Sequence, residues 1–256
     1  MTGRASSEAP ELPAVYEPAV LDHADNIIEQ AVSRARAGAP EGTLLWTRSQ
    51  ASGVGRRGQT WHSPDGGLYG ALILKPDFPV DRAGEIVLVG LVSLGTAIAD
   101  LVVPMTDLRY RWPADLLLGG SRVAGLWLRR DPASDWLILG FSVNVEQRPE
   151  QVFDAGSVCE EGGDTTISSE IVLSGFARHF LSWLNRWAEE GPKPVLRHFR
   201  SRSDTENGAP VALVLPDGEK LAGPSGGIDD QGALVLDSEG QARRISINRF
   251  FGLPGE

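Results

Sequence analysis

Cysteine is the scarcest chemically reactive residue in this sequence: 256 residues contain one, Cys159. A single cysteine excludes an intramolecular disulfide and any metal site built from several thiolates. This usage fits a reducing compartment. Histidine is also rare, and the four histidines have no spacing typical of metal ligands; they are His23, His62, His179 and His198. We therefore expect no metal site built from protein ligands.

Positive charge and long apolar runs are also in short supply. Lys and Arg number 24 against 34 Asp and Glu, which gives a net charge of -10. Without a basic stripe, the surface is unsuited to nucleic acid, and we expect no such partner. The longest apolar region, Glu85–Pro104, is interrupted by Gly90 and Asp100, so we expect no membrane span. The first eleven residues lack the apolar segment of a secretory signal, so the expected location is the cytoplasm.

The spacing of apolar residues predicts the regular elements. Helical periodicity predicts helices over Asp22–Ala37, Ile86–Val102 and Ser168–Ala188. Short β-rich runs bounded by turn residues predict strands: Thr43–Thr47, Leu68–Leu74, Leu108–Trp112, Leu116–Leu118, Val123–Leu128, Trp136–Val145, Val211–Leu215 and Ala233–Leu236. These elements predict three parts. Residues 1–14 form a disordered tail, residues 15–206 an α+β domain with helices packed on one face of its sheet, and residues 207–256 a small β-barrel.

The segment from Gln50 to Trp61 is the richest in glycine and arginine. Gly53–Gly58 satisfies the G-x-G-x-x-G pattern of dinucleotide sites, but the residues that follow it cannot open the helix that such a site requires. What remains is a flexible loop carrying Arg56 and Arg57, whose guanidinium groups suit phosphate oxygens. The segment therefore indicates an anion site, with a solvated turn as the alternative.

Three segments together carry a family resemblance. The run from Gln50 to Tyr69 resembles the biotin protein ligase signature Q-x-x-G-R-G-R-R-G-R-x-W-x-S-P-x-G-x-L-Y, with Val54 and Gln59 in place of two arginines. Residues 111–115 (RWPAD) and 122–126 (RVAGL) resemble K-W-P-N-D and K-x-x-G-I. Residues 139–145 (LGFSVNV) are similar to V-G-x-G-x-N-V. The resemblance covers about residues 20–236, in the family's order.

The resemblance implies a fold and an activity. The fold is α+β, with a mixed or antiparallel sheet and packed helices like class II aminoacyl-tRNA synthetases, plus a small C-terminal SH3-like β-barrel. The activity is ATP-dependent formation of biotinyl-adenylate, with Mg²⁺ accompanying ATP, and transfer to a lysine of a biotin carboxyl-carrier domain. Lipoate or octanoate with a lipoyl domain, and ligand binding without turnover, stay open. Family members often form homodimers. We expect no DNA-binding domain ahead of Asp22.

The resemblance also assigns roles to residues. Arg111 and Arg122 replace the two family lysines that hold the biotin carboxylate and the α-phosphate, which keeps the charge but changes its shape. Asp115 would orient or deprotonate the incoming lysine amine; a turn-capping aspartate is the alternative. The residues expected to bind the acid and its adenylate are Gln50, Gly53, Gly55, Arg56, Arg57, Gly58, Trp61, Trp112, Gly125 and Asn144. Acidic neighbours should raise the pKa of Cys159, so no reactive thiolate is expected.

Overall fold

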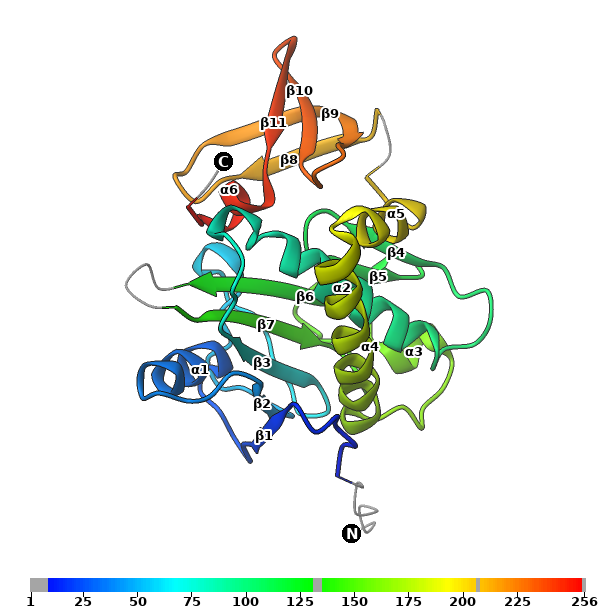
Figure 1. Ribbon diagram of the computed structural model, residues 1–256. Helices are drawn as coiled ribbons and strands as arrows, with labels where there is room; N and C mark the ends of the chain where they lie inside the picture. The colour runs from blue at the N-terminus through cyan, green and yellow to red at the C-terminus, as the bar shows by residue number, and fades with distance from the viewer. Residues whose placement is uncertain (1–8, 131–134, 206–207, 255–256) are drawn as a thin grey trace.

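The computed structural model describes residues 9–130, 135–205 and 208–254, without the side chain of Arg57, and is built around a seven-stranded sheet (Figure 1). The strand order is β1-β2-β3-β7-β6-β5-β4, with β1 and β2 parallel and the other neighbours antiparallel. The strands are β1 (Glu17–Val20), β2 (Thr43–Thr47), β3 (Leu68–Leu74), β4 (Leu108–Arg111), β5 (Asp115–Leu118), β6 (Ser121–Arg130) and β7 (Leu137–Val143). The mixed sheet predicted from the sequence is confirmed.

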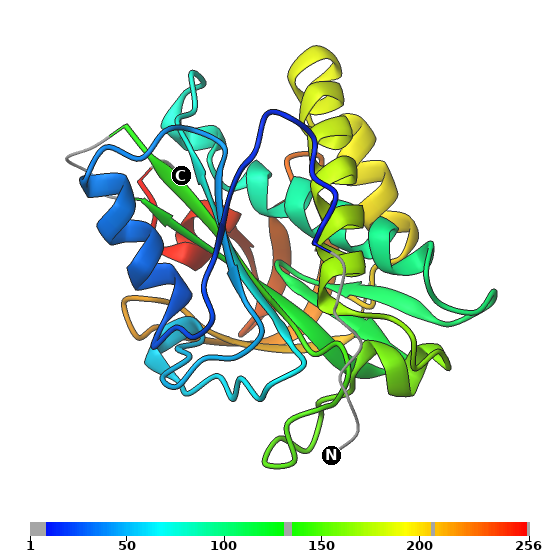
Figure 2. The same ribbon diagram turned by 90° about the horizontal axis from the view of Figure 1, so that it is seen from below.

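Helices cover both faces of this sheet. Helix α1 (Ile27–Arg36) lies on one face, and α2 (Glu85–Ala99), α4 (Ser169–Glu190) and α5 (Lys193–Ser201) lie on the other (Figure 2). The expectation of helices on one face was therefore wrong. Both faces are covered because successive residues of β2 and β3 are apolar and belong to two different hydrophobic cores. Leu44 packs on the α2 side of the sheet and Leu45 on the α1 side.

Helix α2 is the central core helix. The stretch Val80–Ala99 is long and apolar enough to cross a membrane by length and composition alone, since an 18-residue window within it has a mean hydropathy of 1.5. Small residues interrupt this stretch, but its mean hydropathy stays as high as that of a membrane-spanning helix. In this window 78% of the residues are buried inside the protein, between the sheet and α4, which explains an apolar composition on all sides of the helix.

A smaller C-terminal module sits at one end of the sheet (Figure 1). Its antiparallel sheet has the order β11-β10-β9-β8. The elements are β8 (Pro210–Val214), β9 (Lys220–Ile228), β10 (Leu234–Ser238), β11 (Gln241–Ile245) and α6 (Ile247–Phe251). The two strands predicted here are confirmed within two residues, whereas β9, β11 and α6 were not predicted.

Two short segments complete the fold. Residues 1–8 of the predicted tail lie outside the described residues, while Leu12 packs against the main core and the Glu11 amide donates to Ser174 Oγ at 3.0 Å. Residues 9–14 are thus docked on α4. The helix α3 (Val158–Gly162) follows β7 and ends at Gly163 in the left-handed region.

Candidate active site

The glycine-arginine loop, residues 50–61, is tied to the protein at its base by Gln50. The Gln50 Oε1 accepts from the Ile27 amide at 2.8 Å, which satisfies a donor in the first turn of α1, and its Nε2 donates to Ser63 Oγ at 3.0 Å. Gly53 is required by close packing, because a Cβ there would lie 2.4 Å from the Trp61 carbonyl oxygen. Its own carbonyl accepts from the Trp61 amide at 2.8 Å. The base of the loop therefore has a defined shape.

The tip of the loop is a short turn whose arginine is bound to the sheet. Arg56–Gly58 forms a single 3₁₀ turn, closed by the Gly55 amide donating to the Gln59 carbonyl at 2.7 Å. Gly58 has a φ of 71°, a conformation that side chains rarely adopt. The Arg56 guanidinium donates to Asp115 Oδ1 at the start of β5, and both side chains are largely buried. The side chain of Arg57, a predicted site residue, lies outside the described part of the structure.

Trp61 lies over the second motif. The Arg122 guanidinium carbon is 5.2 Å from the Trp61 ring centroid, and the ring meets Trp127 edge-to-face at 4.9 Å. Gly125 makes room for this packing, because a Cβ there would come within 3.2 Å of both Asp115 Oδ1 and the Trp61 ring. Motifs 50–61, 111–115 and 122–126 thus meet around one glycine.

Asn144 faces a small pocket beside this cluster. The pocket has a volume of about 30 Å³. It is lined by Thr60, Trp61, His62, Arg122, Asn144, Pro149, Val152 and Ala155. Asn144 Nδ2 donates to the Gly156 carbonyl at 2.9 Å. Among the described residues its Oδ1 and the indole N–H of Trp61 are buried with no hydrogen-bond partner. Ligand pockets hold roughly 300 Å³ or more, so this pocket is too small for a cofactor-sized ligand in the present conformation.

Arg111 and Trp112 make their contacts elsewhere. Arg111 faces Asp115 in the β4–β5 register, but its side chain is 46% exposed and its Nε donates to Asp204 at 2.8 Å. Trp112 is buried, and its indole N–H donates to the Gly232 carbonyl of the C-terminal module at 2.9 Å. A ligand-binding role for either residue stays a prediction.

The structure adds Phe250 of α6 and Trp127 of β6, which the sequence reasoning missed. They line a groove of about 510 Å³ between the loop and the C-terminal module. Its other lining residues are Gly55, Arg56, Leu128, Val214, Leu215, Pro216, Gly218 and Phe251. The adjacent aromatic residues 250 and 251 were the available signal, but they lie where the family resemblance ends.

The site holds two described cationic side chains, each paired with a carboxylate: Arg56 binds Asp115, and Arg122 lies 3.5 Å from Asp154, whose side chain is 60% exposed. No group of three or more His, Cys, Asp or Glu that could hold a metal ion occurs within residues 9–130, 135–205 and 208–254. Burial, and after it the charges of Glu146 and Asp164, raises the pKa of the Cys159 thiol, as expected. The arrangement therefore suits an anionic ligand and offers no thiolate nucleophile.

Comparison with known proteins places these motifs in a family. The profile of the biotin/lipoate A/B protein ligase family matches residues 12–201. The biotin–[acetyl-CoA-carboxylase] ligase of Mycobacterium tuberculosis is 30% identical over 219 residues, covering 84% of this chain and 81% of that protein. The bifunctional ligase/repressor BirA of Bacillus subtilis is 28% identical over 233 residues. That match covers 82% of this chain, which spans 66% of the length of BirA.

The fold is also that of a solved structure with bound ligands. The biotin protein ligase of Aquifex aeolicus, in complex with biotin and ATP, superposes with a TM-score of 0.77 at 25% sequence identity. The superposition covers 93% of this chain and 99% of that one. The C-terminal module is thus included in the structural likeness.

Proposed function

Since this chain belongs to the biotin/lipoate A/B protein ligase family, we propose that it is an ATP-dependent biotin–protein ligase. In the first step a biotin carboxylate oxygen attacks the α-phosphorus of ATP, and pyrophosphate leaves, giving biotinyl-adenylate. In the second step a lysine amine of a biotin carboxyl-carrier domain attacks the acyl carbon. AMP leaves and the amine loses a proton as the amide forms.

The observation that carries this proposal is the meeting of the glycine-arginine loop with strands β5 and β6. Arg56 reaches Asp115, and Trp61 lies between Arg122 and Trp127 over Gly125. The first step joins two anions and removes no proton, so its main requirement is positive charge held at the phosphate. Arginine supplies that charge as well as lysine does, with a planar fork in place of a point charge. We assign this role to Arg56 and Arg122.

Asp115 is the carboxylate placed for the second step. Its side chain is bound by Arg56 and lies against Gly125, next to the ring of Trp61. A carboxylate here can accept a hydrogen bond from the incoming lysine and orient its nitrogen toward the acyl carbon. We assign Asp115 to that role.

Magnesium fits this scheme as part of the nucleotide. Mg²⁺ keeps several waters and is usually held by substrate phosphates with one or two carboxylates. The described residues offer no group of three or more candidate ligands, and Asp115 is the carboxylate at the loop. We propose that Mg²⁺ enters bound to ATP.

A second candidate is a module that binds ligand without turnover. The observation that favours it is Arg111, whose guanidinium binds Asp204 instead of the loop, where the family has a working lysine. On this view restoring lysine at Arg111 and Arg122 creates activity. On the ligase view that double substitution lowers the existing rate or leaves it unchanged.

The test is transfer of radiolabelled biotin, with ATP and Mg²⁺, to a purified carboxyl-carrier domain. Parallel reactions with lipoate or octanoate and a lipoyl domain identify the acid, and pyrophosphate release reports the first step alone. Arg122→Ala should abolish pyrophosphate release, whereas Arg129→Ala, on the same strand but paired with Glu29 at the surface, should not. Binding of biotin without pyrophosphate release supports the module without turnover. No labelled acceptor with any acid refutes the ligase.

A further inference from the structure

Helix α6 brings one aromatic ring to both motifs of the candidate site. The Phe250 ring is 8% exposed, and its centroid lies 5.6 Å from the guanidinium carbon of Arg56. The same ring meets Trp112 edge-to-face at 5.3 Å. A guanidinium within about 6 Å of a ring centroid is attracted by the ring's electrons. Phe250 therefore links the C-terminal module to the arginine at the loop tip and to the end of β4.

Arg56 is consequently held by two contacts from different parts of the chain. Asp115 binds its charge, and Phe250 supplies an aromatic surface beside it. The loop backbone contains Gly53, Gly55 and Gly58, which give an unheld loop many accessible conformations. The position of the guanidinium therefore depends on these side-chain contacts as well as on the backbone bonds of the loop.

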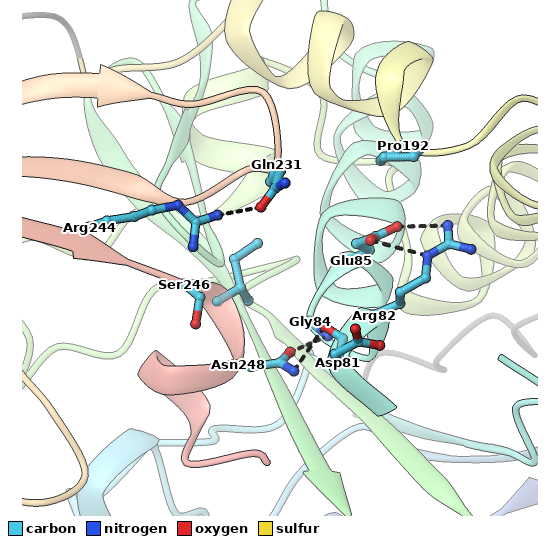
Figure 3. Close-up of a pocket in the computed structure, with 10 residues that line it drawn as sticks. Asp81, Arg82, Gly84, Glu85, Pro192, Gln231, Arg244, Ser246 and Asn248 are labelled. Atoms are coloured by element: carbon cyan, nitrogen blue, oxygen red, sulfur yellow. Dashed lines mark hydrogen bonds and ion pairs between the residues drawn. The ribbon is translucent and has the colours of Figure 1, made fainter. Parts of the chain in front are cut away.

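Phe250 is itself fixed by Asn248, two residues earlier on α6. Figure 3 shows Asn248 reaching the start of α2 at the edge of a pocket of about 370 Å³. Its Oδ1 accepts from the Gly84 amide at 2.7 Å, and its Nδ2 donates to the carbonyls of Asp81 and Pro254, each at 3.0 Å. Gly84 is the N-cap of α2, so its amide has no partner within that helix. The buried amide thus seats α6 on the core helix of the catalytic domain.

We propose that Phe250 is a positioning residue for ATP activation: it holds the Arg56 guanidinium where the phosphate of the nucleotide binds. The C-terminal module thereby completes the loop site without contributing a group to the reacting atoms. The kinetic part of this inference rests on the proposed ligase function. The structural part, that Phe250 orders the loop, does not.

The test uses the full chain with three substitutions on one helix. Phe250→Leu keeps apolar volume but removes the ring, Phe250→Tyr keeps the ring, and the control Arg249→Ala removes a side chain of the same helix that binds Glu219 at 2.6 Å. Losing the ring–guanidinium contact should raise the KM for ATP in pyrophosphate exchange by about 5- to 30-fold, with a smaller change in kcat. Phe250→Tyr should restore the wild-type KM, and Arg249→Ala should leave it unchanged.

Hydrogen exchange provides a readout that needs no turnover. In Phe250→Leu the amides of Gly55 and Trp61, which close the loop on Gln59 and Gly53, should exchange faster, while those of β8–β11 keep their protection. Wild-type loop exchange and wild-type KM in Phe250→Leu would overturn the proposal. So would faster exchange across the whole module, because Phe250 would then be a packing residue only. Absence of turnover in the wild type refutes the ligase function and leaves the exchange result to decide this inference.

Discussion

Replacing Asp115 with asparagine tests the connection between the glycine-arginine loop and the sheet. The substitution keeps the shape of the side chain and removes its charge. Arg56 and Asp115 have side chains that are 15% and 11% exposed. Removing one partner of a buried ion pair costs about 3–5 kcal/mol when the other charge stays buried. That figure is an upper limit here, because Arg56 lies on a surface loop that can leave.

The expected loss follows from what else holds Arg56. If the guanidinium moves to water, the cost is its contact with Phe250, about 1–2 kcal/mol. Moving the guanidinium into water costs less free energy than keeping it buried without Asp115. The Asp115→Asn protein should therefore lose about 1–2 kcal/mol of unfolding free energy. For a chain of this size that lowers Tm by roughly 2–8 °C. The loop should open while the core stays intact.

The rate of biotin transfer should respond to the substitution more strongly than the unfolding free energy does. Losing a group that orients the attacking amine should slow transfer from preformed biotinyl-adenylate by about 10²- to 10⁴-fold. Calorimetry gives Tm, and single-turnover transfer to the carrier domain gives the rate. Asp107→Asn is the matched control, because Asp107 binds Arg109 at the exposed start of β4. A wild-type transfer rate in Asp115→Asn, or a Tm loss well above 8 °C, would refute the reasoning.

Three further outcomes are expected. Arg111→Ala should lower kcat/KM far less than Arg122→Ala in the biotin-transfer assay, because Arg111 is half exposed and bound to Asp204. Burial holds the pKa of Cys159 above its ordinary value of 9.0. The protonated thiol therefore contributes fully to stability below pH 9, and this contribution is lost as pH rises further. The unfolding free energy of the wild type, measured with denaturant, should fall above pH 9, and it should fall more than that of Cys159→Ala. Asn248→Ala leaves the Gly84 amide without its acceptor and should cost about 1–3 kcal/mol in the same unfolding assay.

Most of the fold around the seven-stranded sheet could be predicted because its strands carry strong local signals. The bounds of β2 and β3 were predicted to the residue, and β5 and β6 are joined by the turn at Gly119-Gly120, where both glycines have positive φ. Strand β1 was missed because it is a short edge strand held by parallel pairing with β2, a partner 26 residues later in the register. Pairing of that kind leaves no periodic pattern in four residues.

The candidate site was predictable only in part, for a related reason. Glycine and arginine in one segment indicated the loop, and the motif around Asp115 indicated the second segment. That Arg56 binds Asp115 depends on how the loop folds onto the start of β5, and that Arg111 instead binds Asp204 depends on how β4 and the segment after α5 come together. Phe250 depends on the docking of α6 onto the sheet, across almost 200 residues of chain from Arg56. Contacts between distant segments have no signature in a single sequence.

The bond between Asn248 and the start of α2 also sets an order of events during synthesis. The Gly84 amide meets its acceptor 164 residues later in the chain. At about 5–20 residues per second, a ribosome makes that acceptor roughly 8–33 s after Gly84. Until then the Gly84 amide lacks the acceptor that it has in the folded protein. We expect this end of α2 in the nascent chain to remain accessible to chaperones and proteases until residue 248 has emerged.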